Sequence, residues 1–214
     1  MSNEKQKKMI LRFLLSVIVI FGMIAPIAAS GAPRKSNGSY WPSNVTNIYF
    51  SYSSDQFNTT EAGQLSIALG RWNSANNRTE ADTLGVNKKY MYLTTGTSNN
   101  RISYPVSWVG MGYDSSFVAV CDPYPDTGAI SQVSIYLNPN KSFSVSSQAG
   151  KYHLQSIIVH EAGHALGVAH CHELGETCRS STCGTNVMTY TINPGSVRCA
   201  LQPYDYSSYY VIYQ

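Results

Sequence analysis

Three of the five histidines in this 214-residue chain fall within the stretch HEAGHALGVAH (160–170). His160 and His164 are four residues apart, so on a helix they project from nearly the same face and their imidazoles can share one metal ion. Glu161 lies one position around that helix, where its carboxylate can reach a water on the metal without being a ligand. We therefore predict that the two histidines bind a metal ion and that Glu161 acts on its water.

A third ligand can come from His170, which follows the expected helix. The chain must turn sharply back for this side chain to meet the first two, and Gly167 permits the positive φ that such a turn usually needs. Three neutral nitrogen ligands with an open fourth position are the catalytic arrangement for zinc, whereas a closed four-ligand site is structural. The pattern predicts one catalytic Zn²⁺, which lowers the pKa of a bound water from about 15.7 towards about 7.

The whole motif, HExxHxxGxxH, resembles that of the metzincin clan of zinc endopeptidases, in which a turn containing a methionine follows. The stretch TNVMTY (185–190) comes fifteen to twenty residues after His170. The resemblance implies that Met188 lies in that turn, beneath the zinc. Tyr190 resembles the tyrosine of the astacin and serralysin branches, which binds the resting metal and then stabilises the oxyanion.

This resemblance implies a secreted zinc-dependent endopeptidase. In that mechanism zinc holds a water and polarises the scissile carbonyl, while Glu161 takes the proton of the water and passes it to the leaving amine. Zinc and Tyr190 then stabilise the tetrahedral oxyanion. The expected partner is a peptide or protein substrate.

The resemblance also implies where the substrate binds. The strand at 129–137 resembles the upper edge strand that holds an extended substrate by backbone pairing in this clan, which makes Ser134 and Tyr136 candidate substrate-binding residues. Thr191 and Ile192, just after the methionine turn, are expected to wall the pocket beyond the scissile bond.

Hydrophobic periodicity indicates the elements that must position these residues. The histidines are expected on a helix over 153–166 that ends at Gly167. A second long helix is expected to begin at Asn58, because Asn58 and Glu61 resemble a capping box. Strands are expected over 45–52, 89–95 and 129–139, and a closing helix over 201–213, with Pro203 near its first position and Asp205 in its first turn.

The expected fold class is α+β and metzincin-like: a twisted mixed sheet, two long helices, and a small C-terminal subdomain stapled by cysteines and ended by the closing helix. The first long helix and the closing helix resemble those of the matrixins. We expect one catalytic domain over 44–214, with an upper subdomain at 44–167 and a lower subdomain at 168–214.

The N-terminus has the layout of a secretory signal peptide over 1–30, with a basic head, an apolar run and small residues. An uncleaved anchor, which would leave the domain on the outer face of the membrane, is the alternative. Residues 31–43 are expected to be a flexible lead-in. The leader holds four of the fifteen Lys and Arg and one of the twelve acids, which leaves eleven of each. We therefore expect no nucleic-acid partner, no membrane association after cleavage, and a monomer.

All five cysteines lie beyond the leader, where disulfides can persist. We expect disulfides among Cys171, Cys178, Cys183 and Cys199, with Cys121 as an odd structural thiol. A second zinc bound by the C-terminal cysteines and an inhibitory Cys121 thiolate on the catalytic zinc are alternatives. The loops are poor in acids, which makes a structural calcium site doubtful.

Two other classes of function fit parts of the sequence. One is a recognition module of the cell surface that binds zinc but catalyses no reaction. Glu161 argues against this class, because a site that only binds zinc does not need a general base. The other is a sugar-binding module, suggested by the sixteen tyrosines. Because the tyrosines are scattered along the chain, packing and surface contacts are the simpler interpretation.

Overall fold

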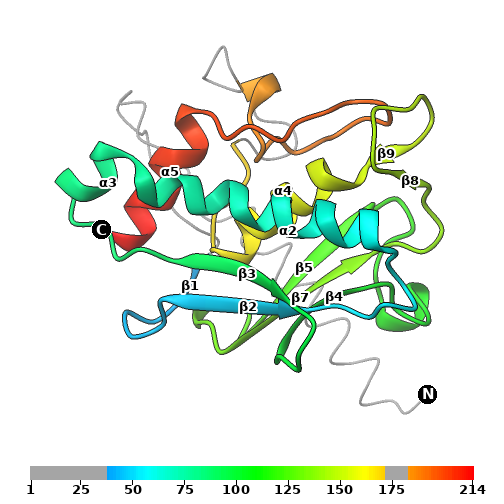
Figure 1. The fold of residues 1–214 in the computed structure, drawn as a ribbon, viewed down its shortest axis with the longest axis horizontal. Coiled ribbons are helices and arrows are strands. Elements are labelled where there is room, and N and C mark those ends of the chain that lie inside the picture. Colours follow the sequence, from blue (N-terminus) through cyan, green and yellow to red (C-terminus); the bar gives the residue numbers. More distant parts are fainter. Residues whose placement is uncertain (1–37, 172–182) are drawn as a thin grey trace, which may run out of the picture.

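The computed structural model describes residues 38–171 and 183–214, which form a mixed α+β fold (Figure 1). Its centre is a five-stranded sheet in the order β3-β2-β4-β7-β5. The strands are β2 (Asn47–Ser51), β3 (Tyr90–Thr94), β4 (Asn100–Ser103), β5 (Ala119–Tyr124) and β7 (Gln132–Leu137). All neighbours pair in parallel except β5 and β7, which are antiparallel. The α+β class and the mixed sheet are as predicted.

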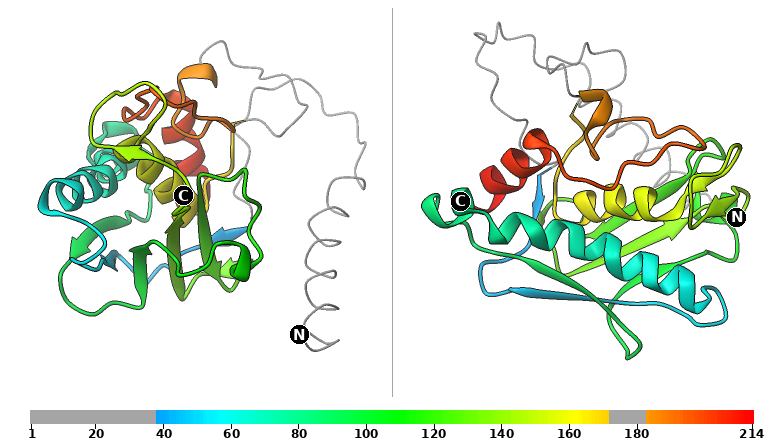
Figure 2. Two further views of the ribbon diagram at one scale, coloured as in Figure 1. Left: turned by 90° about the vertical axis from the view of Figure 1, so that its right-hand side faces the viewer. Right: turned by 45° about the horizontal axis from the view of Figure 1, so that its top comes forward.

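Two long helices, α2 (Thr59–Asn73) and α4 (Leu154–Ala165), cover one face of the sheet (Figure 2). A third helix, α5 (Pro203–Tyr213), closes the described chain. The shorter elements are β1 (Ser39–Tyr40), η1 (Ser74–Asn77), α3 (Thr79–Thr83), η2 (Val109–Met111), β6 (Gly128–Ala129), β8 (Phe143–Ser144), β9 (Tyr152–His153) and η3 (Cys183–Thr185). Among the helices of the described ranges, none has the length and apolar character needed to cross a membrane.

Helix α2 begins where the capping box predicts. The Asn58 side chain accepts from the backbone N–H of Glu61 at 3.0 Å, and the Glu61 carboxylate accepts from the backbone N–H of Asn58 at 2.9 Å. The apolar residues at helical spacing are the buried ones, and they end in Trp72, which is fully buried. This stripe packs on α4 and on the inner face of the sheet.

The predicted substrate-binding strand is not an edge. Strand β7 lies between β4 and β5, so the edges of the sheet are β3 and β5. Ser134 and Tyr136, both on β7, are 4% and 5% exposed. The prediction was wrong because β5 folds back antiparallel to β7 and covers it. The sequence of β5, AVCDPY, includes a proline and lies in a turn-rich region, so it did not read as a full strand.

Residues 38–43 are part of the fold and not the flexible lead-in that was expected. Strand β1 pairs in parallel with β6. Trp41 is 5% exposed, and its indole N–H donates to the carbonyl of Ala165 at 2.8 Å, at the end of α4. The Trp41 backbone N–H donates to the Tyr213 hydroxyl of α5 at 3.3 Å. The predicted signal peptide at 1–30 lies outside the described residues.

Helices α2 and α4 approach closely at a glycine. The indole N–H of Trp72 donates to the carbonyl of Val159 at 2.8 Å. A Cβ built on Gly163 would lie 2.6 Å from the Cζ2 atom of Trp72 and closer still to the sulfur of Met188. Real Cβ atoms essentially never approach so closely, and the indole is fixed by its hydrogen bond. The helix therefore needs a residue without a side chain at this position.

We predict that Gly163→Ala lowers the free energy of unfolding by about 1–3 kcal/mol, because the added methyl group overpacks a filled core. Gly70→Ala is the matched control on α2, where an added Cβ meets no atom within 4 Å. There the replacement should stabilise the protein by up to about 1 kcal/mol, through helix propensity. Urea unfolding of both variants measures the difference, and equal effects would contradict the close approach.

Candidate metal centre

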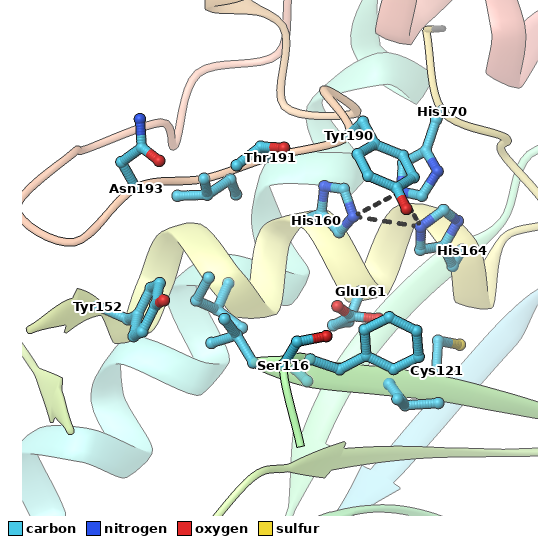
Figure 3. A pocket seen from close by; sticks show the side chains of 16 residues that line it. Ser116, Cys121, Tyr152, His160, Glu161, His164, His170, Tyr190, Thr191 and Asn193 are labelled. Carbon is cyan, nitrogen blue, oxygen red and sulfur yellow. Dashed lines mark hydrogen bonds between the residues drawn. The ribbon is translucent and has the colours of Figure 1, made fainter. Parts of the chain in front are cut away.

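Helix α4 and the turn after it bring three histidines together (Figure 3). His160 and His164 project from the same side of α4, and Gly167 has a φ of 79°, which lets the chain turn back as predicted. The Nε2 atom of His170 lies 3.1 Å from that of His160 and 3.1 Å from that of His164. The Nε2 atoms of His160 and His164 are 3.2 Å apart.

The 3.2 Å contact between His160 and His164 is not a hydrogen bond between the two rings. The Nδ1 of His160 lies 2.8 Å from the carbonyl of Val187, and the Nδ1 of His164 lies 2.8 Å from the carbonyl of Val168. A carbonyl only accepts, so both Nδ1 atoms carry the proton and both Nε2 atoms present lone pairs. Burial lowers the pKa of His160 to about 4 and that of His164 well below its usual value, so both rings are neutral at neutral pH.

Lone pairs that converge at about 3 Å repel unless a cation lies between them. Zinc–nitrogen bonds of about 2.0–2.1 Å at tetrahedral angles place ligand nitrogens about 3.3–3.4 Å apart. The observed 3.1–3.2 Å separations agree with this within a few tenths of an ångström. Within residues 38–171 and 183–214, these histidines are the only group of three or more His, Cys, Asp or Glu arranged to hold a metal ion. The triad can therefore hold a metal ion.

Glu161 lies beside the triad and is 7% exposed. Burial raises the pKa of its carboxyl group to about 8, although a hydrogen bond from the backbone N–H of Cys121 on β5 opposes this shift. A dication held by the triad would favour the charged form and lower this pKa. The group of side chains that could hold a metal ion consists of the three histidines and does not include Glu161.

One cavity of about 470 Å³ is lined by His160, Glu161, His164 and His170 (Figure 3). The predicted Thr191 and Ile192 line it, whereas Ser134 and Tyr136 do not. Residues 116–121 form the opposite wall of this cavity. They are the three residues before β5 and the first three residues of that strand. Sequence reasoning missed this wall, because the wall depends on how β5 pairs in the sheet.

Tyr190 lines the same cavity and is 36% exposed. Its ring lies edge-on to that of His170, with the centroids 5.1 Å apart. Figure 3 shows its hydroxyl on the side of the ring that faces the imidazoles. A phenol in this place can donate a hydrogen bond to a group bound in the cavity.

Met188 is fully buried, and its sulfur fills the space beside Gly163 of α4, where a Cβ would otherwise lie. The turn that carries it is held by Asp205, whose carboxylate accepts from the backbone N–H groups of Val187 and Met188, each at 3.2 Å. Asp205 also accepts from the N–H of Gln202 at 2.7 Å. The sequence placed Asp205 at the start of the closing helix, but no local signal indicated these long-range bonds.

The cysteine predictions are met only in part. Cys121 is a free thiol, as expected, but Cys199 is also free and does not form the expected disulfide. Its sulfur lies 3.3 Å from the Ser156 hydroxyl, near the start of α4. Cys171 is disulfide-bonded, as expected. Cys178 lies outside the described residues, so the pairing among Cys171, Cys178 and Cys183 stays a prediction.

We predict that the protein binds one Zn²⁺ per chain, and that the bound ion raises the melting temperature because it binds only the folded state. His164→Gln should abolish retention of the ion by removing one of three ligands. His153→Gln is the matched control, since this buried histidine lies at the start of α4 and bonds to Ser156 instead. Metal content after dialysis and thermal unfolding with added zinc measure both effects. Equal zinc content in the two variants would contradict the site.

A scan against models of protein families found no match to this chain, and a search of curated proteins found none either. The function must therefore be inferred from the geometry of the site.

Proposed function

We propose that the protein is a secreted, zinc-dependent endopeptidase of the metzincin type. The observation that carries this proposal is the convergence of three Nε2 atoms, two of which present lone pairs, beside a buried carboxylate in a cavity open to solvent. The donor set is all nitrogen and the triad leaves further coordination positions open, which fits catalytic zinc better than a structural ion. When bound, zinc would supply a water of lowered pKa and polarise a peptide carbonyl.

Glu161 is placed to serve as the general base. Its carboxylate lies at the same cavity as the histidines and is held in place by the N–H of Cys121. In the proposed reaction it accepts a proton from water and later gives that proton to the leaving amine. Tyr190, across the cavity next to His170, donates its hydroxyl hydrogen bond to the oxyanion.

A comparison of the two sheet edges favours binding of an extended peptide along β5 over binding along β3. At the other edge, the Asn73 side chain occupies both backbone groups of Met91 on β3, donating to its carbonyl at 2.9 Å and accepting from its N–H at 2.7 Å. A strand cannot add to a segment that is closed in this way. The β5 edge instead runs along the cavity, with Ala119, Val120 and Cys121 in its wall. A substrate strand paired there would cross the metal centre.

Zinc binding without turnover is the alternative function. A recognition module needs the three ligands but gains nothing from Glu161, whose burial costs free energy and contributes no ligand. Retention of that carboxylate beside the triad favours the hydrolase. We further propose that the protein is a monomer, that its substrate is a protein or peptide, and that it has no nucleic-acid partner.

We predict that the zinc-loaded protein digests a general substrate such as casein, and that a chelator stops digestion. Glu161→Gln should retain zinc but lower the rate of hydrolysis by about 10²–10⁴-fold, because the general base is lost. Glu80→Gln is the control: Glu80 is an exposed acid, paired with Arg78 at 3.0 Å, and its replacement should leave the rate unchanged. Undiminished hydrolysis by the Glu161 variant would refute its role as base.

We predict that Tyr190→Phe lowers kcat by about 10²-fold with little change in KM, because the hydroxyl acts on the oxyanion and not on the bound substrate. Tyr40→Phe, at an exposed tyrosine of β1 that does not line the cavity, is the control and should behave as the unmodified protein. Steady-state kinetics on a peptide substrate separates the two parameters. A rise in KM alone would assign Tyr190 to substrate binding.

A further inference from the structure

The outer face of the sheet, opposite α2 and α4, carries an exposed pair of tyrosines. Along β2 the side chains alternate, so Ile48 and Phe50 are buried while Tyr49 points outward. Tyr49 pairs in register with Tyr92 of β3, and their rings stack with centroids 5.5 Å apart. The two side chains remain 48% and 40% exposed. They form a flat aromatic surface that no described side chain covers.

A hollow of about 440 Å³ opens on the same face, at the ends of β2 and β4. Arg101 of β4 lies in its wall and pairs in register with Ser51, two residues along β2 from Tyr49. Strands about 4.8 Å apart with a rise of about 3.3 Å per residue place the Cα atom of Arg101 about 8 Å from that of Tyr49 and about 12 Å from that of Tyr92. Residues that carry hydroxyl groups also line the hollow, among them Ser51, Tyr52, Ser103 and Tyr136. The Ser51 hydroxyl donates to the carbonyl of Asn100 at 3.1 Å and can still accept a hydrogen bond.

The positive charge of Arg101 has no carboxylate partner within the described chain. Its guanidinium lies 5.3 Å from the centre of the Tyr136 ring and donates to the Tyr136 hydroxyl at 2.6 Å. The ion pairs found among the described residues are Arg78–Glu80 and Lys88–Asp82. No Asp or Glu lines the hollow. Most N–H donors of the guanidinium fork are therefore available to an anion, and the fork matches a carboxylate.

We propose that this outer face is a binding site for an acidic oligosaccharide. The apolar face of a sugar ring packs on the Tyr49–Tyr92 surface, while Arg101 binds the carboxylate of a uronic acid unit and the wall hydroxyls bind its ring hydroxyls. A peptide fits this face less well. Strands β2 and β4 are internal, so their backbone groups pair within the sheet and cannot accept an added strand.

This site is separate from the metal cavity, since the two share no lining residue. Binding at the outer face therefore leaves the histidine triad open. The proposal stands whether or not the protein hydrolyses peptides. For a secreted hydrolase, the site would hold the enzyme on an acidic glycan while its cavity stays accessible.

The test is calorimetric titration of the full chain with a tetrasaccharide that alternates glucuronic acid and N-acetylglucosamine. We expect saturable binding that weakens with added salt, and none with a neutral tetrasaccharide of N-acetylglucosamine. Arg101→Gln should weaken binding at least about tenfold, the loss expected for a charge-assisted hydrogen bond. Tyr92→Ala should weaken it as well, through loss of the aromatic surface.

Arg78→Gln is the matched control, because Arg78 also stacks on a tyrosine, 4.5 Å from the Tyr206 ring, but is already paired with Glu80. It should bind as the unmodified protein, and thermal unfolding should show all three variants folded. Absence of binding to the acidic tetrasaccharide, or equal affinity after Arg101→Gln, would overturn the site. Equally tight binding of a hexaglutamate peptide would overturn the assignment to a sugar.

Discussion

Two hydrogen bonds from imidazole to backbone fix the candidate site. Each ring donates its Nδ1 proton to a carbonyl, His160 to Val187 and His164 to Val168, so each Nε2 lone pair has a fixed direction. The two carbonyls come from different parts of the chain, one from the turn before Met188 and one from the turn after α4. Val168 lies inside the histidine motif but Val187 does not, so the motif alone would leave the His160 ring without its backbone partner. The site needs both turns in place, and the rest of the domain holds those turns.

The turn at Val187 depends on the last helix. Asp205 of α5 accepts three backbone N–H groups, two of them from Val187 and Met188. Glu161 is also a buried acid but accepts one backbone N–H, from Cys121. Burial raises the pKa of both carboxyl groups, yet the oxygens of Asp205 are occupied whereas Glu161 has acceptor capacity left. This difference separates an anchoring carboxylate from one that can take a proton from water.

The sequence predicted the parts of the site that are close along the chain. His160, Glu161 and His164 share one helix, and Gly167 takes the expected positive φ, because helix periodicity and glycine geometry are local properties. The pairing of β5 with β7 is not local, so the edge strand was assigned wrongly. Trp41 likewise lies in a stretch rich in Gly, Pro and Ser, and only its contacts with the ends of α4 and α5 bring it into the core.

The two faces and two edges of the sheet have different chemistry, and this difference explains where ligands can bind. The inner face is covered by α2 and α4, and the β3 edge is closed at Met91 by the side chain of Asn73. Two surfaces remain: the β5 edge, which offers backbone groups beside the metal centre, and the outer face, which offers side chains only. A ligand recognised through its backbone suits the first, and one recognised through rings, hydroxyls and charge suits the second. The β5 edge and the outer face of β2, β3 and β4 belong to one sheet, so the two proposed ligands would lie on one frame without either occupying the site of the other.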